Sequence, residues 1–149
     1  MPKNKVFGQA GGGIEVSEQA NLRFERGFNA TGKCTIICRN SISFGQDVLV
    51  SWNTLFMDSD QHSLMDNDGK LLNYDDSIKI GNHVWTSSNV TILKKTVIGN
   101  KYVVGCNTLI HDKFEQDNIL IAGNPANIRR ERINWSYKKP RRLEYIETN

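Results

Sequence analysis

The stretch IKIGNHVWTSSNVTILKKTVIGNKYVVGCNTLI, residues 78–110, repeats its residue types every six positions. One mostly apolar series comprises Cys38, Phe44, Val50, Phe56, Ile80, Thr86, Ile92, Ile98, Val104 and Ile110. A second, mostly β-branched series comprises Ile36, Ile42, Val48, Thr54, Ile78, Val84, Val90, Thr96, Tyr102 and Thr108. A helix repeats every ~3.6 residues and a strand every ~2, so neither element alone explains this period. Six-residue repeats are typical of a parallel β-helix, with three short strands in each coil of about 18 residues.

Glycine follows several members of the first series, as in FGQDVL, IGNHVW, IGNKYV and VGCNTL. A chain that turns every six residues needs a positive φ or a close backbone approach at its corners, and glycine permits both. The alternative fold is a β-sandwich with evenly spaced strands, but sandwich strands recur at variable intervals of about 8–12 residues. The pattern therefore predicts an all-β parallel β-helix, although it does not determine the handedness of the coil.

Length and composition predict one soluble domain. The 149 residues suit a single hydrophobic core. The net charge of +3 is uneven, because the last 22 residues contain seven Lys or Arg and three Glu. No apolar run approaches the ~20 residues of a membrane helix, and the start lacks the apolar core of a secretory signal, so we expect a cytoplasmic protein. Cys34, Cys38 and Cys106 form no CxxC pair, and we expect reduced, mostly buried thiols.

The six-residue register is lost between Phe56 and Ile80, so residues 57–78 are predicted to form a loop outside the coil. This loop contains His62, which is flanked by Asp58 and Asp60. A neighbouring carboxylate can fix the tautomer of a histidine and stabilise its cationic form, as a general base acting on an alcohol requires. The other interpretation of the local pattern is a solvated loop histidine.

Metal sites are not predicted. A calcium loop needs an oxygen ligand at its first position and glycine at its sixth, and counting back from Gly69 places Leu64 first. The three histidines, His62, His83 and His111, are 21 and 28 residues apart. No two of them share a face of a coil of about 18 residues, so a three-histidine zinc site is not expected.

The repeats, followed by IAGNPANIRR at residues 121–130, resemble the hexapeptide-repeat O-acetyltransferases. This family includes galactoside and maltose acetyltransferases and enzymes that acetylate capsule or lipopolysaccharide sugars. The resemblance covers residues 14–132 and implies a left-handed parallel β-helix, a homotrimer with active sites between subunits, acetyl-CoA as donor and a saccharide as acceptor. It also implies that His62 is the general base that deprotonates the acceptor hydroxyl for direct attack on the thioester. Asp58 or Asp60 would orient it.

The same resemblance implies a coenzyme A site. The positions that match the family's are Trp85, Ser88, Gly105, Cys106, Gly123, Asn124, Pro125 and Arg130. Trp85 and Ser88 match the reacting end of the pantetheine, with Ser88 or a nearby N–H stabilising the oxyanion, and Arg130 matches a residue near the nucleotide phosphates. The alternatives are that Trp85 covers a corner and that Ser88 caps a turn. Cys106 is expected to be a small packing residue, because no base that would activate it is apparent.

Some residues depart from the family pattern. Thr86 and Ser87 replace the usual Ile-Gly after the tryptophan, and Asn127 stands where a basic residue is frequent. Residues 1–132 are predicted to form the acyltransferase domain, and its first coil must be closed by residues 1–20 or by a partner. The first half of residues 128–149 is predicted to form a short helix, and residues 133–149 are predicted to form a basic tail. The tail would pack through Ile133 and Trp135, bind an anionic partner, or lie on a membrane surface.

Two other functions remain open from the sequence. The first is a sugar N-acyltransferase of the same architecture, in which the acceptor is an amine. The second is a catalytically silent β-helix that serves as a binding scaffold. The presence of His62 in a carboxylate-rich loop argues against the silent scaffold. Nucleic-acid binding is not expected, since a few basic residues without a recognised module are common.

Overall fold

The computed structural model describes residues 4–7 and 12–140, and all regular elements in these ranges are β-strands. Sheet A contains β1 (Asn4–Phe7), β2 (Gly13–Val16), β5 (Cys34–Cys38), β8 (Thr54–Met57), β11 (Thr91–Leu93) and β14 (Leu109–Ile110). Sheet B contains β3 (Asn21–Phe24), β6 (Ser41–Phe44), β9 (Ile78–Ile80), β12 (Val97–Ile98) and β15 (Lys113–Phe114). Sheet C contains β4 (Asn29–Ala30), β7 (Leu49–Val50), β10 (Val84–Thr86), β13 (Tyr102–Val104), β16 (Ile119–Ala122) and β17 (Asn127–Glu131).

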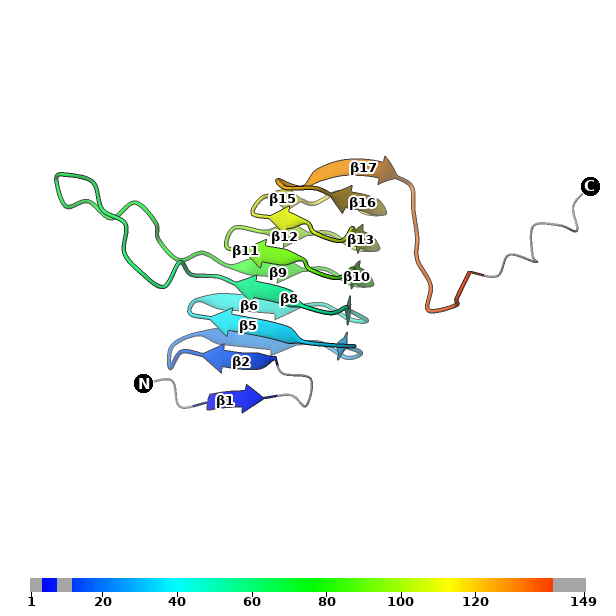
Figure 1. The fold of residues 1–149 in the computed structure, drawn as a ribbon, viewed down its shortest axis with the longest axis horizontal. Helices are drawn as coiled ribbons and strands as arrows, with labels where there is room; N and C mark the ends of the chain where they lie inside the picture. Colours follow the sequence, from blue (N-terminus) through cyan, green and yellow to red (C-terminus); the bar gives the residue numbers. More distant parts are fainter. Residues whose placement is uncertain (1–3, 8–11, 141–149) are drawn as a thin grey trace, which may run out of the picture.

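The chain visits sheets A, B and C in turn, so each coil adds one strand to every wall of a three-sided prism (Figure 1). Strands of successive coils pair in parallel from β2 to β16. The predicted parallel β-helix is thus confirmed. The later coils have the predicted length of 18 residues, as the pairing of Val84 with Tyr102 shows. The first coils are longer, because Cys34 pairs with Thr54, 20 residues away. The extra residues lie in the corners, where they do not alter the strand phase.

The core of the prism consists of the two six-residue series. Every member of both series is buried, and none exceeds 4% exposure. Because a strand alternates its side chains, the two residues separated by one position both point inward and the residue between them points out. Aromatic contacts add to this core: the rings of Phe44 and Phe56 meet edge to face with 4.8 Å between their centroids.

Close backbone approach explains the corner glycines. A Cβ on Gly81 would lie 2.3 Å from the carbonyl oxygen of Gly99 in the next coil. The positive φ angles lie two residues later along the repeat, at Asp47, His83 and Lys101. Asparagine side chains connect successive coils at the same corners: Asn82 Oδ1 accepts a hydrogen bond from the Gln46 N–H at 2.8 Å. Of the two properties that favour glycine at corners, close approach is therefore the one used here.

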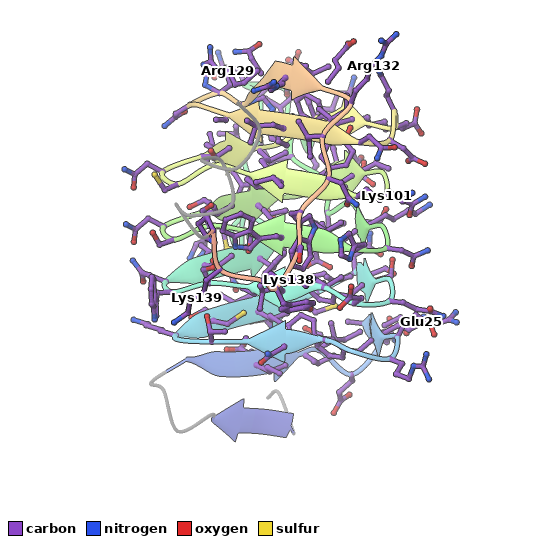
Figure 2. All side chains as sticks on the ribbon, turned by 90° about the vertical axis from the view of Figure 1, so that its right-hand side faces the viewer. Glu25, Lys101, Arg129, Arg132, Lys138 and Lys139 are labelled. Atoms are coloured by element: carbon purple, nitrogen blue, oxygen red, sulfur yellow. The ribbon has the colours of Figure 1, made fainter. Side chains whose placement is uncertain are left out.

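The two ends of the solenoid break the parallel pattern. At the first coil, β1 pairs antiparallel with β2. At the other end, β17 turns back and pairs antiparallel with β16. The short helix predicted in the first half of residues 128–149 is wrong: residues 127–131 form β17, whose backbone groups pair with those of β16, and residues 132–140 contain no helix. Residues 133–139, which we call the strap, then run extended down the side of the prism (Figures 1 and 2). Most of the basic tail, residues 141–149, lies outside the described residues.

Candidate active site

His62 lies on the long loop that leaves the prism between β8 and β9, at the edge where sheet A meets sheet B (Figure 1). The arm of the loop is a short hairpin, with a bridge between Met65 and Leu71. Asn73 braces its base: its Nδ2 donates to the His62 carbonyl at 2.8 Å, and its Oδ1 accepts from the Leu64 N–H at 2.7 Å. The sequence analysis missed Asn73, whose contacts depend on the loop folding back on itself.

The His62 side chain lines a cavity of about 440 Å³ at the base of this loop. The cavity lies within the ~300–1,000 Å³ range of small-ligand sites. Its walls are mostly polar, formed by Arg39, Asn40, Ser59, Gln61, His62, Ser63, Leu71, Asn73, Tyr74 and Asp75. Among the described residues, none is hydrogen-bonded to the His62 imidazole, so both ring nitrogens are available to a bound molecule.

The Asp58 carboxylate is fully buried and faces the coil below. It accepts the N–H of Arg39 at 2.7 Å and the N–H of Asn40 at 2.9 Å, and Cys38 Sγ lies 3.6 Å away. Burial, and then the Asp58 charge, raise the pKa of the Cys38 thiol to about 12. Asp58 therefore anchors the start of the loop to the preceding corner. A direct orienting role toward His62 stays a prediction.

Asp60 points toward the coil above instead. Its Oδ2 accepts a hydrogen bond from Lys94 Nζ at 2.6 Å and one from Asn73 Nδ2 at 2.9 Å. The hydrogen bond from Lys94, followed by that from Asn73, lowers the pKa of Asp60. The carboxylate is therefore ionised at neutral pH, and it ties the loop to β11 rather than contacting the imidazole in this chain.

Arg39 is a second site residue that the sequence analysis missed. It reaches the cavity from the corner after β5 and donates to Glu15 at 2.6 Å, to Ser17 at 2.8 Å and to Gln61 at 3.1 Å. Its guanidinium thus links the coil that contains Glu15 and Ser17 to Gln61, the residue before His62. The signal available in the sequence was only a basic residue at a corner, which is common on protein surfaces.

The residues expected to bind coenzyme A lie along a different edge, where sheet C meets sheet A. Ser88 follows β10, Cys106 follows β13 and Gly123 follows β16, so the three occupy successive coils. Hydrogen bonds connect the levels: the Asn107 N–H donates to the Ser88 carbonyl at 3.1 Å. Thr108 Oγ1 donates to the Gly105 carbonyl at 2.7 Å and accepts the Gly123 N–H at 3.2 Å. We call this line of corners the C–A column.

The remaining expected donor residues flank the C–A column. Trp85 lies on the outer face of sheet C, and its Nε1 donates to Ser51 Oγ at 3.2 Å. Arg130 is exposed on β17 opposite Leu120, and Asn124 and Pro125 are exposed in the turn between β16 and β17. Cys106 is exposed, which contradicts its interpretation as a packing residue. The corner turns its side chain outward, so the thiol faces solvent along the column.

Within one chain, His62 and the C–A column lie on different edges of the prism. The loop joins sheet A to sheet B, whereas Ser88 and Cys106 lie where the chain passes from sheet C to sheet A. The width of sheet A separates the two edges. A single chain therefore contains both halves of the expected site and does not bring them together.

Within residues 4–7 and 12–140, no group of three His, Cys, Asp or Glu side chains is placed to hold a metal ion. No helix in the same ranges is long and apolar enough to span a membrane.

Several proteins similar in sequence to this chain are O-acetyltransferases. No family model matches the sequence. The polysialic acid O-acetyltransferase of Neisseria meningitidis is 38% identical over 108 residues, which is 72% of this chain and 50% of that protein. The galactoside O-acetyltransferase of Escherichia coli is 29% identical over 120 residues, which is 79% of this chain and 58% of that protein. The chain therefore spans a little over half the length of these relatives.

Solved structures show the same architecture. A crystal structure of a polysialic acid O-acetyltransferase superimposes with a TM-score of 0.73 at 33% identity, covering 85% of this chain and 61% of that one. A galactoside acetyltransferase in complex with coenzyme A superimposes with a TM-score of 0.62 at 24% identity, covering 80% of this chain and 63% of that one. At this lower identity the second match supports the fold alone.

Proposed function

This chain belongs to the hexapeptide-repeat O-acetyltransferase family, and from that membership we propose that it transfers an acetyl group from acetyl-CoA to a saccharide hydroxyl. The observation that carries the proposal is the His62 cavity. A cavity lined by amide, hydroxyl and charged side chains fits a polyhydroxylated acceptor, because each sugar hydroxyl needs a hydrogen-bond partner when it leaves water.

The proposed mechanism is direct transfer with His62 as the general base. The neutral imidazole accepts the proton of an acceptor hydroxyl, and the oxygen attacks the thioester carbonyl to form a tetrahedral intermediate. Collapse of this intermediate breaks the C–S bond, and the proton on His62 passes to the departing CoA thiolate. The His62 imidazole has no hydrogen-bond partner among the described residues, which is consistent with an imidazole that is free to take this proton.

The C–A column is proposed to bind the donor. Ser88 and the neighbouring N–H groups would stabilise the oxyanion, and a donor of this type typically contributes about 3 kcal/mol. A Cβ on Gly105 would lie 2.8 Å from the Ala122 Cβ, and one on Gly123 would lie 2.8 Å from the Arg129 guanidinium, so close packing within the column requires glycine at both positions. Arg130, at the end of the prism, would pair with the nucleotide phosphates.

Assembly is proposed to complete the site. The outer face of sheet C carries an apolar line, Leu49, Trp85, Val103 and Leu120, and that of sheet A carries Ile37, Leu55, Met57, Leu93 and Leu109. Sheet B instead exposes charged residues such as Lys79 and Lys113. A homotrimer would cover apolar faces and bring the His62 edge of one subunit beside the C–A column of the next.

Release of free thiol from acetyl-CoA tests this function. We expect release in the presence of a saccharide from a panel of neutral sugars, amino sugars and oligosaccharides, and an alkali-labile ester in the product. His62→Ala should lower kcat by about 10²–10⁴-fold, while His111→Ala, in an exposed corner, should match the unmodified protein. The proposal is wrong if no acceptor gives thiol release and acetyl-CoA does not bind.

A further inference from the structure

The strap is held against the prism by Trp135. This side chain is only 8% exposed, although its neighbours on the strap are exposed. Its ring stacks on the His83 imidazole with 4.1 Å between centroids and 9° between planes. Its Nε1 also donates to the His83 carbonyl at 2.9 Å. Figure 2 shows the strap descending from Arg132 to Lys138 across the coils to this level.

Both ring nitrogens of His83 face acceptors. Nδ1 lies 2.5 Å from Asp47 Oδ2, and Nε2 lies 3.0 Å from the Trp135 carbonyl oxygen. A carbonyl oxygen has no proton to donate. The hydrogen bond from Tyr137, followed by that from His83, lowers the pKa of Asp47, so its carboxylate also only accepts. Both contacts are satisfied together only when the imidazole carries a proton on each nitrogen.

Tyr137 closes the arrangement from the strap. Its hydroxyl donates to Asp47 Oδ1 at 2.6 Å, and its ring meets that of Trp135 edge to face at 4.9 Å. Burial, followed by the hydrogen bond to Asp47, raises the pKa of Tyr137 to about 12, so the phenol keeps its proton at neutral pH. The Asp47 carboxylate thus joins His83 on the prism to Tyr137 on the strap, one oxygen to each.

Trp135 also reaches the proposed donor site. Its ring lies 6.1 Å from that of Trp85, and Trp85 is held from the other side by its hydrogen bond to Ser51. We propose that residues 133–139 form a clasp, closed by protonated His83, in which Trp135 positions Trp85 for the acyl donor. Only the donor role of Trp85 rests on the proposed function. The clasp itself rests on the contacts among His83, Asp47, Trp135 and Tyr137.

The clasp responds to pH in a direction that the contacts determine. The charged and titratable groups around His83 are Asp47 on the coil below, Lys101 at the same corner of the coil above, and Tyr137 with the following Lys138 on the strap. The closed clasp binds a proton that a neutral His83 lacks, so it opens as the pH rises. Asp47 has a lowered pKa, so its contribution is lost only when the pH falls through that value.

The indole ¹H–¹⁵N signals of the full chain test the closure. We expect the Trp135 signal, assigned by its loss in Trp135→Phe, to move through one transition between about pH 5.5 and 8.5, where imidazoles titrate. His83→Asn, which keeps a residue suited to the positive φ at this position, should remove the transition. His111→Asn, an exposed histidine near Asp112, should retain it. An unchanged Trp135 signal, or the same transition in His83→Asn, overturns the clasp.

Steady-state kinetics test the positioning of Trp85. Trp135→Ala should raise the KM for acetyl-CoA about fivefold with little change in kcat, and Trp135→Phe should restore most of the affinity. If Trp135→Ala does not fold, Tyr137→Phe removes only one hydroxyl and should raise this KM in the same direction. An unchanged KM in an active variant overturns the positioning role. If the unmodified protein has no activity and does not bind acetyl-CoA, the proposed function is refuted. The pH transition of Trp135 does not depend on that function, so it would still test the clasp.

Discussion

Asp60, on the loop that carries His62, and Lys94, directly after β11, form an ion pair that holds the base of the loop to the next coil. Asp60 Oδ2 and Lys94 Nζ are 2.6 Å apart, and the lysine side chain is only 15% exposed although the loop projects into solvent. Asp58, at the first residue of the loop, and the hydrogen bond from Arg39 to Gln61 hold the loop to the preceding coil. The geometry of the His62 cavity therefore depends on two carboxylates that act on different coils.

Asp60→Asn should destabilise the protein at neutral pH and not in acid. The pKa of Asp60 is lowered, so its stabilising effect is present above the unfolded value of about 4 and disappears as the pH falls through the folded value. The Asp60 side chain is 45% exposed, and we therefore expect a loss of only about 0.5 kcal/mol. Urea denaturation at pH 7 and near pH 2 measures the difference. Equal losses at both pH values would show that the pair contributes nothing.

Asp58→Asn should be far more damaging than Asp66→Asn. Each carboxylate accepts two backbone N–H groups, but Asp58 is fully buried and Asp66 is exposed at the tip of the loop. An asparagine at position 58 would turn its NH₂ toward one of these donors, and we expect a loss of about 2–3 kcal/mol in the free energy of unfolding. At position 66 both N–H groups bind the same oxygen, Oδ1, which an asparagine retains, so the loss should stay below about 0.5 kcal/mol.

The KM for the acceptor is a second measurement on the same variants. A raised acceptor KM in Asp58→Asn, measured where the variant is folded, would indicate that the buried carboxylate also sets the His62 cavity. Similar losses of stability in the two variants would contradict the assigned importance of burial.

Cys106 should be the thiol that alkylating reagents modify first. It is exposed, whereas burial raises the pKa of Cys34 to about 11 and, together with the Asp58 charge, that of Cys38 to about 12. The thiolate is the reactive form, so half-buried Cys34 and buried Cys38 should stay unmodified near pH 8. Mass spectrometry after iodoacetamide treatment identifies the site. Acetyl-CoA, which has no free thiol, should protect Cys106 if the C–A column binds the donor, and Cys106→Ser should abolish labelling.

Thr86→Val and Thr108→Val should change stability in opposite directions. Both threonines are buried, but Thr86 Oγ1 has no hydrogen-bond partner, whereas Thr108 Oγ1 bonds to Gly105 and Gly123. Removing the unpaired hydroxyl should stabilise the protein by about 1 kcal/mol, and removing the paired one should cost about 1–2 kcal/mol. Thermal or urea denaturation of the two variants measures both. A destabilised Thr86→Val would mean that the hydroxyl has a partner.

Much of the fold was predictable because burial inside a narrow prism constrains residue type at every inward position. All twenty positions of the two series are buried, so the period was a direct record of the core. The loss of that period located the loop between Met57 and Ile78 and, with it, His62. The short helix predicted in the first half of residues 128–149 was wrong because the start of this segment pairs with β16, which no local pattern reveals.

The sequence by itself determined which residues face inward, where the coil is interrupted and which chemical groups the loop contains, because each of these depends on a local or periodic constraint. Only the tertiary structure decided which partners the two loop aspartates contact, that Arg39 and Asn73 frame the cavity, and that His62 and the C–A column lie on separate edges. It also decided that Trp135 packs on His83, 52 residues away in the chain. These relationships depend on how many residues separate successive coils, and hydrogen bonds between distant residues leave no periodic trace in the sequence.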